Sequence, residues 1–188
     1  MAEHRKYFEY LRQRSRFALF YRNYWLYPRL SKELHGHVLD VGCGVGDLLA
    51  FRPNTTGVDI NPHTVAWCRS NGLDVHEMIN DVLPFEDQLF QGAVLDNVLE
   101  HIADPRALLS EISRVLVSKG VLVVGVPGKR GYAADSDHKI FYEKALLVEV
   151  LGYAGFALRR MIPMPLPIPG LGRCLSQYCL YGVFVRSS

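Results

Sequence analysis

The sequence contains few cysteines and little net charge. Its 188 residues include four cysteines, with no C-x-x-C pair and no spacing typical of a zinc site. We therefore expect reduced thiols in a cytoplasmic protein and not a disulfide framework. The net charge of +2 is too small to indicate a nucleic-acid partner. The polar residues at positions 1–6 do not have the pattern of a secretory signal peptide.

The sequence also lacks an uninterrupted apolar run of membrane-spanning length. Over residues 161–172, prolines alternate with large apolar residues, which excludes a transmembrane helix. An apolar loop of this kind is unusual at a protein surface. We expect it to cover the N-terminal segment, or to contact a membrane, an apolar substrate or a partner subunit, for example in a homodimer.

The first 35 residues mix aromatic and basic side chains. Over residues 3–34 the apolar side chains recur every three or four positions, which predicts helix with a break or a new start at Pro28. We expect residues 1–35 to be a helical extension of one compact domain over residues 36–188. The extension either packs on the sheet edge with a solvated basic face, or forms a lid that selects an anionic or lipid-linked substrate. Residues 3–30 could also lie on a membrane surface.

The most informative stretch is residues 38–49, where a short apolar run leads into three glycines and then into a helical pattern. The glycines are Gly42, Gly44 and Gly46, and an acid, Asp40, stands two residues before the first. Strand, glycine turn and helix make a ligand-binding βα unit. The dinucleotide pattern G-x-G-x-x-G requires a glycine at position 47, which is Asp47, so the spacing argues against a nicotinamide or flavin oxidoreductase.

This stretch resembles motif I of the class I S-adenosyl-L-methionine (SAM)-dependent methyltransferases. Two later segments continue the resemblance: residues 79–85 match an adenine-binding turn, and residues 96–105 match a segment of the subgroup that acts mostly on small molecules. The resemblance covers about residues 36–186. It implies SAM as cofactor and methyl transfer. From the aromatic and basic N-terminal segment and the apolar loop, we expect the acceptor to be a small or lipid-linked molecule that is methylated on oxygen.

The order of apolar runs and helical patterns predicts an α/β fold. We expect a doubly wound, seven-stranded Rossmann-like sheet whose last strand is antiparallel, with an N-terminal helical extension. The strands are expected at 38–41, 56–60, 73–77, 90–95, 121–126, 156–161 and 180–186. The main helices are expected at 47–51, 63–70, 106–117 and 143–151, and a polar loop at 129–138 over the substrate side.

Asp59 follows Asp40 by 19 residues, the place where doubly wound folds hold an acid against ribose hydroxyls. Ile60 is then expected against the adenine. The resemblance implies that Asp81 binds the adenine amino group and that the Val82 N–H reaches a ring nitrogen. The expected cofactor-binding residues are Asp40, Gly42, Cys43, Gly44, Gly46, Asp59, Ile60, Asp81, Val82, Asp96 and Asn97.

A hydroxyl acceptor requires a base, and His138 and His101 are the candidates, with Tyr132 as a third. We expect no metal site. The alternative is a divalent ion on Glu100, His101 and His138, as in relatives that carry a Glu-x-x-Glu-His segment here; Asn97 replaces the first of those carboxylates. Two other functions stay open: methylation of RNA, and a catalytically idle protein that binds SAM or a partner.

Overall fold

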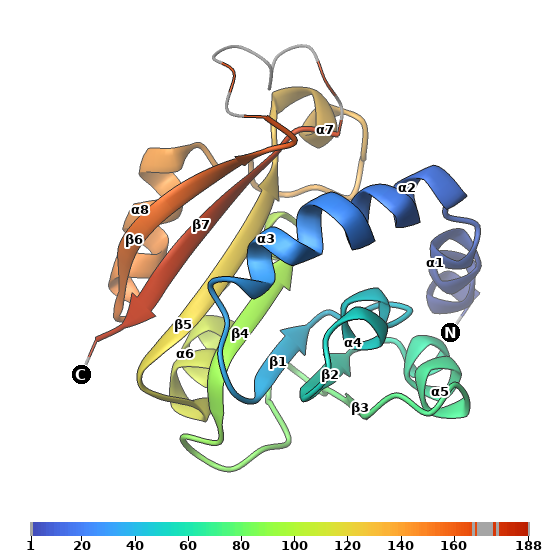
Figure 1. Cartoon of the computed structure of the whole chain (residues 1–188), viewed down its shortest axis with the longest axis horizontal. Helices are drawn as coiled ribbons and strands as arrows, with labels where there is room; N and C mark the ends of the chain where they lie inside the picture. The colour runs from blue at the N-terminus through green and yellow to red at the C-terminus, as the bar shows by residue number, and fades with distance from the viewer. Residues whose placement is uncertain (1, 167, 169–174, 176, 188) are drawn as a thin grey trace.

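A seven-stranded mixed sheet runs through the centre of the chain (Figure 1). This computed structural model describes residues 2–166, 168, 175 and 177–187. The sheet order is β3-β2-β1-β4-β5-β7-β6. The strands are β1 Val38–Val41, β2 Thr55–Asp59, β3 Val75–Glu77, β4 Phe90–Asp96, β5 Leu116–Pro127, β6 Phe156–Met164 and β7 Cys179–Arg186.

The first five strands are parallel, and the order reverses between β1 and β4. All four residues of β1 are buried, as expected of a strand that is covered on both faces. Val41 pairs with Val58 of β2 and with Leu95 of β4, so these three strands end at the same level. Ligands of open α/β sheets bind at the carboxyl ends of the strands, where the order reverses.

The last strands confirm the predicted antiparallel hairpin, because β7 pairs antiparallel with both β5 and β6. The helix predicted to reach residue 117 ends earlier. The helix ends at Val115, and β5 begins at Leu116. The pairing of β5 with β4 is irregular between Phe90 and Gly92, so the early part of β5 is a bulged extension that an apolar pattern at 121–126 does not reveal.

Helices cover both faces of the sheet, as in a doubly wound fold. On one face α6 (Arg106–Val115) and α8 (Lys144–Tyr153) bury Leu109, Ile112 and Leu147. On the β1–β3 half lie α4 (Asp47–Phe51) and α5 (Pro62–Ser70). The segment expected as a polar loop contains a short helix, α7 (Lys129–Ala133).

The N-terminal segment is helical but is divided differently from the prediction. It forms α1 (Ala2–Arg12), α2 (Arg16–Tyr21), the π-helical η1 (Arg22–Leu26) and α3 (Tyr27–Ser31). In Figure 1, α3 lies in front of the strands, and α1 lies beside α5. The break lies at residues 13–15, where the Ser15 hydroxyl caps α2, whereas Pro28 lies in the first turn of α3. Leu26, Leu30 and Leu34 pack against one face of the sheet.

Of the apolar segment 161–172, residues 161–164 belong to β6. The rest of that prediction falls mostly on residues 167 and 169–172, which lie outside the described residues. Within the described part of the chain, every helix is too short or too polar to cross a lipid bilayer.

Candidate functional site

The loop after β1 has glycine at three positions where the backbone conformation favours it. Gly42, Gly44 and Gly46 have φ angles of 73°, 53° and 79°, the left-handed region that side chains disfavour. A Cβ at Gly42 would lie 2.6 Å from Val98, and one at Gly46 would lie 2.4 Å from Leu73. The three glycines therefore hold a tight backbone turn at the carboxyl end of β1, the shape that a bound ligand can approach closely.

Asp59 ties the end of β2 to this loop. Its Oδ2 accepts the N–H of Gly44 at 2.8 Å, and its Oδ1 accepts the N–H of Asn61 at 2.8 Å. The carboxylate is buried, and burial raises its pKa although both N–H groups favour the charged form. A carboxylate has about four acceptor positions, so Asp59 can accept further bonds from ligand hydroxyls.

Three exposed aliphatic side chains lie beyond β2 and β3. Ile60, Ile79 and Val82 are 56%, 64% and 58% exposed, which is unusual for aliphatic groups at adjoining strand ends. Asn80 and Asp81 have φ angles of 50° and 60° and form the tight turn between Ile79 and Val82. The Val82 N–H donates to the Ile79 carbonyl at 3.1 Å, so it is not free for an adenine nitrogen as predicted.

The side chain of Cys43 packs into the core. Its thiol points into the core beside Cys68, and a Cβ at Gly57 would lie 2.7 Å from its sulfur. The Cys68 thiol in turn donates to the Gly44 carbonyl at 3.3 Å. Only the backbone of Cys43 remains for the predicted contact with a cofactor.

The ends of β1 and β4 bring two acids together. Burial, and then the nearby Asp96, raise the pKa of Asp40 to about 8. Asp96 Oδ1 accepts the Tyr181 hydroxyl at 2.6 Å and the Asn97 amide at 2.9 Å, while its Oδ2 lies 3.8 Å from Arg22 Nη1. The predicted pair Asp96–Asn97 is therefore held by β7 and by an N-terminal arginine, two contacts that no local pattern indicates.

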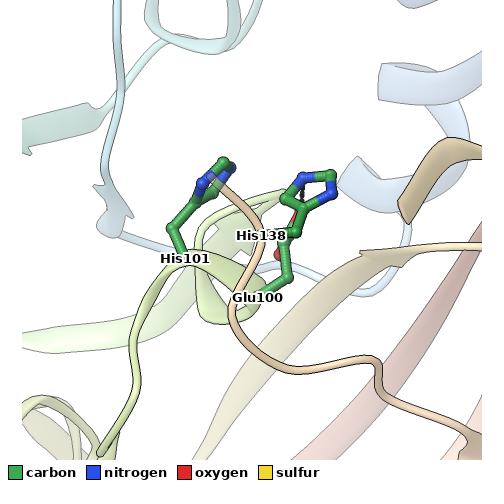
Figure 2. Close-up of side chains that lie close together, drawn as sticks. All are labelled: Glu100, His101 and His138. Atoms are coloured by element: carbon green, nitrogen blue, oxygen red, sulfur yellow. Dashed lines mark ion pairs between the residues drawn. The ribbon is translucent and has the colours of Figure 1, made fainter. Parts of the chain in front are cut away.

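Glu100, His101 and His138 form a second cluster, drawn in Figure 2. Glu100 is fully buried, and neither carboxylate oxygen has a hydrogen-bond partner among the described residues. Burial raises its pKa to about 8. His138 Nε2 lies 3.8 Å from Glu100 Oε1, and the ring centroids of His101 and His138 are 4.6 Å apart. One ligand atom from each residue lies within 4.8 Å of the others, a spacing compatible with a divalent ion.

The tautomer of His138 follows from its surroundings. Its Nδ1 lies 2.8 Å from the Tyr132 carbonyl, which can only accept, so Nδ1 carries the proton and Nε2 has the free lone pair. Burial, and then His138, lower the pKa of His101. The N–H groups of Lys139 and Ile140 donate to the Glu100 carbonyl at 2.7 and 3.2 Å, which fixes the loop that carries His138 over η2 (Leu99–His101).

Helix α1 and the turn that follows it contact the residue pair after β2 and the start of α4. The Asn61 amide donates to the His4 carbonyl at 2.7 Å, and Arg14 Nη2 lies 2.5 Å from Asp47 Oδ1. Partial burial, and then Asp59, raise the pKa of Tyr7 to about 12, with a smaller effect from Glu100. No pattern in the sequence distinguishes Tyr7 or Arg14 from the other aromatic and basic residues of this segment.

Comparisons with known proteins find similar methyltransferases. Residues 39–124 match the family model of the methyltransferase domain. The chain is 32% identical over 153 residues to the Mycolicibacterium smegmatis protein named "Probable S-adenosylmethionine-dependent methyltransferase", a match that covers 71% of this chain and 60% of that protein. It is 35% identical over 125 residues to the O-methyltransferase cnsE of Penicillium expansum, covering 58% and 42%.

Among solved structures, a SAM-dependent methyltransferase from Thermotoga maritima superposes with a TM-score of 0.72 at 18% identity, covering 100% of this chain and 95% of that one. This likeness concerns the fold. The chain spans 60% and 42% of the lengths of the two curated relatives described above.

Proposed function

We propose that the chain is a class I SAM-dependent methyltransferase, which the matches of its sequence support, and that it transfers the methyl group of SAM to an oxygen of a small or lipid-linked acceptor. One observation carries the proposal: the glycine loop, closed by the bond from Gly44 to Asp59, opens on the same sheet edge as the buried His138 cluster. A cofactor cradle and a proton acceptor at one edge are what methylation of a hydroxyl requires.

The residues present fit SAM. Gly44 leaves room for close backbone approach, because a Cβ there would meet only Leu11 at 3.3 Å. Asp59 has spare acceptor positions for two ribose hydroxyls. Ile60, Ile79 and Val82 offer exposed apolar surface for a flat base. We propose that Asp81, in the turn beside them, selects the adenine amino group, and that Asp40 and Asp96 face the cationic amino-acid end.

SAM supplies an activated methyl group when bound, so the remaining task of the chain is to orient the acceptor, exclude water and remove a proton. We propose that His138 Nε2 takes this proton, because Nδ1 is held by the Tyr132 carbonyl. Burial, and then His138, lower the pKa of His101, which favours the uncharged form of that neighbouring imidazole. In this account α1 and the N-terminal extension, residues 1–35, act as the lid of the domain over residues 36–188.

The Glu100 cluster has an alternative role. Two imidazoles and one carboxylate match the ligand types of zinc and other first-row divalent ions better than those of magnesium. The two unpartnered oxygens of Glu100 favour this reading. Against it, Asn97, which would be the next oxygen ligand, is engaged by Asp96 at 2.9 Å and by the Cys179 thiol at 3.5 Å. We therefore keep the proton acceptor as the first assignment.

The outer surface of the N-terminal helices supports a lipid-linked acceptor. Phe17, Phe20 and Tyr24 are 80%, 60% and 71% exposed, and the rings of Phe20 and Tyr24 lie 4.6 Å apart. Aromatic and basic side chains on one helix favour contact with an anionic lipid surface. Flotation with anionic vesicles, for wild type and a Phe17→Ser, Phe20→Ser variant, tests this contact; equal flotation of both contradicts it, and concentration-dependent self-association would instead indicate a homodimer.

Transfer of isotopically labelled methyl from SAM tests the proposed reaction. We expect label in small phenols or lipid-linked hydroxyl compounds and loss of transfer in the His138→Ala variant. Labelled RNA with unlabelled small molecules would replace the acceptor class with RNA. Binding of SAM without transfer to any acceptor class would contradict an enzymatic role and favour an idle SAM-binding protein.

A further inference from the structure

Arg14 reaches from the N-terminal helices to the end of the glycine loop. It lies in the short turn between α1 and α2, and its Nη2 donates to Asp47 Oδ1 at 2.5 Å, 33 residues further along the chain. Asp47 directly follows Gly46 and is the first residue of α4. The turn that carries Arg14 therefore sits on the segment that closes the proposed cofactor cradle.

The guanidinium of Arg14 is incompletely used. Its Nη1 makes a long bond of 3.4 Å to the Leu11 carbonyl, and its Nε is buried with no hydrogen-bond partner in the described part of the chain. A buried N–H without an acceptor is rare and requires an explanation. The side chain of Leu11, one turn earlier, would be 3.3 Å from a Cβ at Gly44, so the unused N–H lies in a segment that overlies the loop.

Three carboxyl groups lie near the loop. Asp40, Asp59 and Asp96 are at the ends of adjacent strands, and Asp59 and Asp96 suit the ammonium and sulfonium of SAM when charged, whereas the raised pKa of Asp40 leaves that group uncharged near neutral pH. The same molecule carries a carboxylate on its amino-acid end, which these acids would repel. Arg22 is less suited to bind it, because Nη1 already donates to the Tyr27 hydroxyl at 3.0 Å and lies near Asp96.

We propose that Arg14 binds the carboxylate of the amino-acid end of the cofactor, with Asp47 holding the guanidinium in place. The planar fork of arginine donors matches a carboxylate better than a lysine ammonium does. The inference rests on the proposed use of SAM. It assigns to the lid a direct contact with the cofactor, so that the lid and the cofactor stabilise one another.

The test compares two ligands by calorimetry: S-adenosylhomocysteine and its decarboxylated form, which lacks that carboxylate alone. We expect wild type to bind the complete ligand about tenfold more tightly or better, as for a charge-assisted hydrogen bond. In Arg14→Gln this ratio should fall to about one to two, with the affinity for the decarboxylated ligand nearly unchanged. Arg16→Gln is the matched control, since Arg16 is exposed on the next helix, and it should keep the wild-type ratio.

A second variant separates binding from lid docking. Asp47→Asn removes the ion pair but leaves Arg14, and it should lower the preference for the complete ligand by less than Arg14→Gln does. Equal weakening of both ligands in Arg14→Gln would show that the pair only docks the helices and would overturn the inference. Wild type that binds both ligands equally also overturns it. Folded wild type that binds neither overturns the proposed function itself.

Discussion

The carboxylate of Asp59 accepts the backbone N–H of Gly44 at 2.8 Å. This bond joins the glycine loop after β1 to the end of β2. Both oxygens of Asp59 are held by backbone N–H groups, so its orientation is fixed before any ligand arrives. A preorganised acceptor loses little freedom on binding, which makes Asp59 the residue on which cofactor affinity should depend most.

Substitution of Asp59 tests this dependence. Asp59→Ala removes the acceptor for two ribose hydroxyls and should weaken binding of S-adenosylhomocysteine by about 1–3 kcal/mol. Titration calorimetry of wild type and variant measures the difference. Asp74→Ala, at an exposed acid that pairs with His76, serves as a control for general loss of charge. Unchanged affinity in folded Asp59→Ala would remove Asp59 from the site.

The middle glycine can be tested against a glycine of equal strain elsewhere. Gly44→Ala and Gly72→Ala both place a side chain at positive φ, and each should cost about 1 kcal/mol of stability or slightly more. A Cβ at Gly72 meets nothing within 4 Å and lies outside the loop, whereas one at Gly44 enters the cradle. Thermal melts should therefore match, while S-adenosylhomocysteine affinity falls only in Gly44→Ala. Equal affinities would show that the ligand does not approach this backbone.

The base assignment predicts a division between binding and turnover. His138→Ala should lower the turnover number roughly 100-fold or more, as for removal of a general base, while affinity for S-adenosylhomocysteine stays within about twofold. His76→Ala removes a histidine from β3, which stands at the end of the strand order, and is the control. Steady-state rates with an acceptor that the wild type methylates give the turnover number, and calorimetry gives the affinity for S-adenosylhomocysteine. Equal turnover of wild type and His138→Ala would exclude His138 as the base.

The metal alternative makes a different prediction for the same cluster. If His138 acts as a proton acceptor, wild type freed of metal with a chelator should keep its turnover, and zinc or manganese should not raise it. Elemental analysis of the purified protein gives an independent measure. Activity that disappears with the chelator and returns with a divalent ion would assign Glu100, His101 and His138 as its ligands.

The raised pKa of Asp40 predicts a pH-dependent stability. Burial, and then Asp96, raise it to about 8 from 3.8, so the folded state binds this proton more tightly than the unfolded state. The resulting stability is complete below about pH 4 and is lost as the pH rises through about 8. Asp40→Asn lacks this titration. Its melting temperature minus that of wild type should therefore increase between about pH 5 and about pH 9. Calorimetric melts across this range measure the difference, and a constant or falling difference would contradict the account.

The sequence predicted the parts of the site that rest on local patterns. The run from Asp40 to Gly46 and the apolar strand that ends at Asp59 both follow from residue type and spacing, so the strand-turn-helix unit and its acid could be placed. The occupied Val82 N–H could not, because it depends on a turn with two positive φ angles at Asn80 and Asp81.

Contacts between distant segments were beyond such patterns. Tyr181 bonds to Asp96 across 85 positions, and Arg14 bonds to Asp47 across 33. Each depends on how helices or the final hairpin pack against the sheet, which spacing along the chain does not encode. The residues that the sequence missed are therefore those that reach the site from another element.

Calorimetric titration of the full chain with S-adenosylhomocysteine tests the central claim most directly. The account predicts binding of one ligand per chain with a dissociation constant of roughly micromolar order, because the glycine loop and Asp59 are already in place. A folded protein with no measurable binding would contradict the account, and the likeness to methyltransferases would then describe the fold alone.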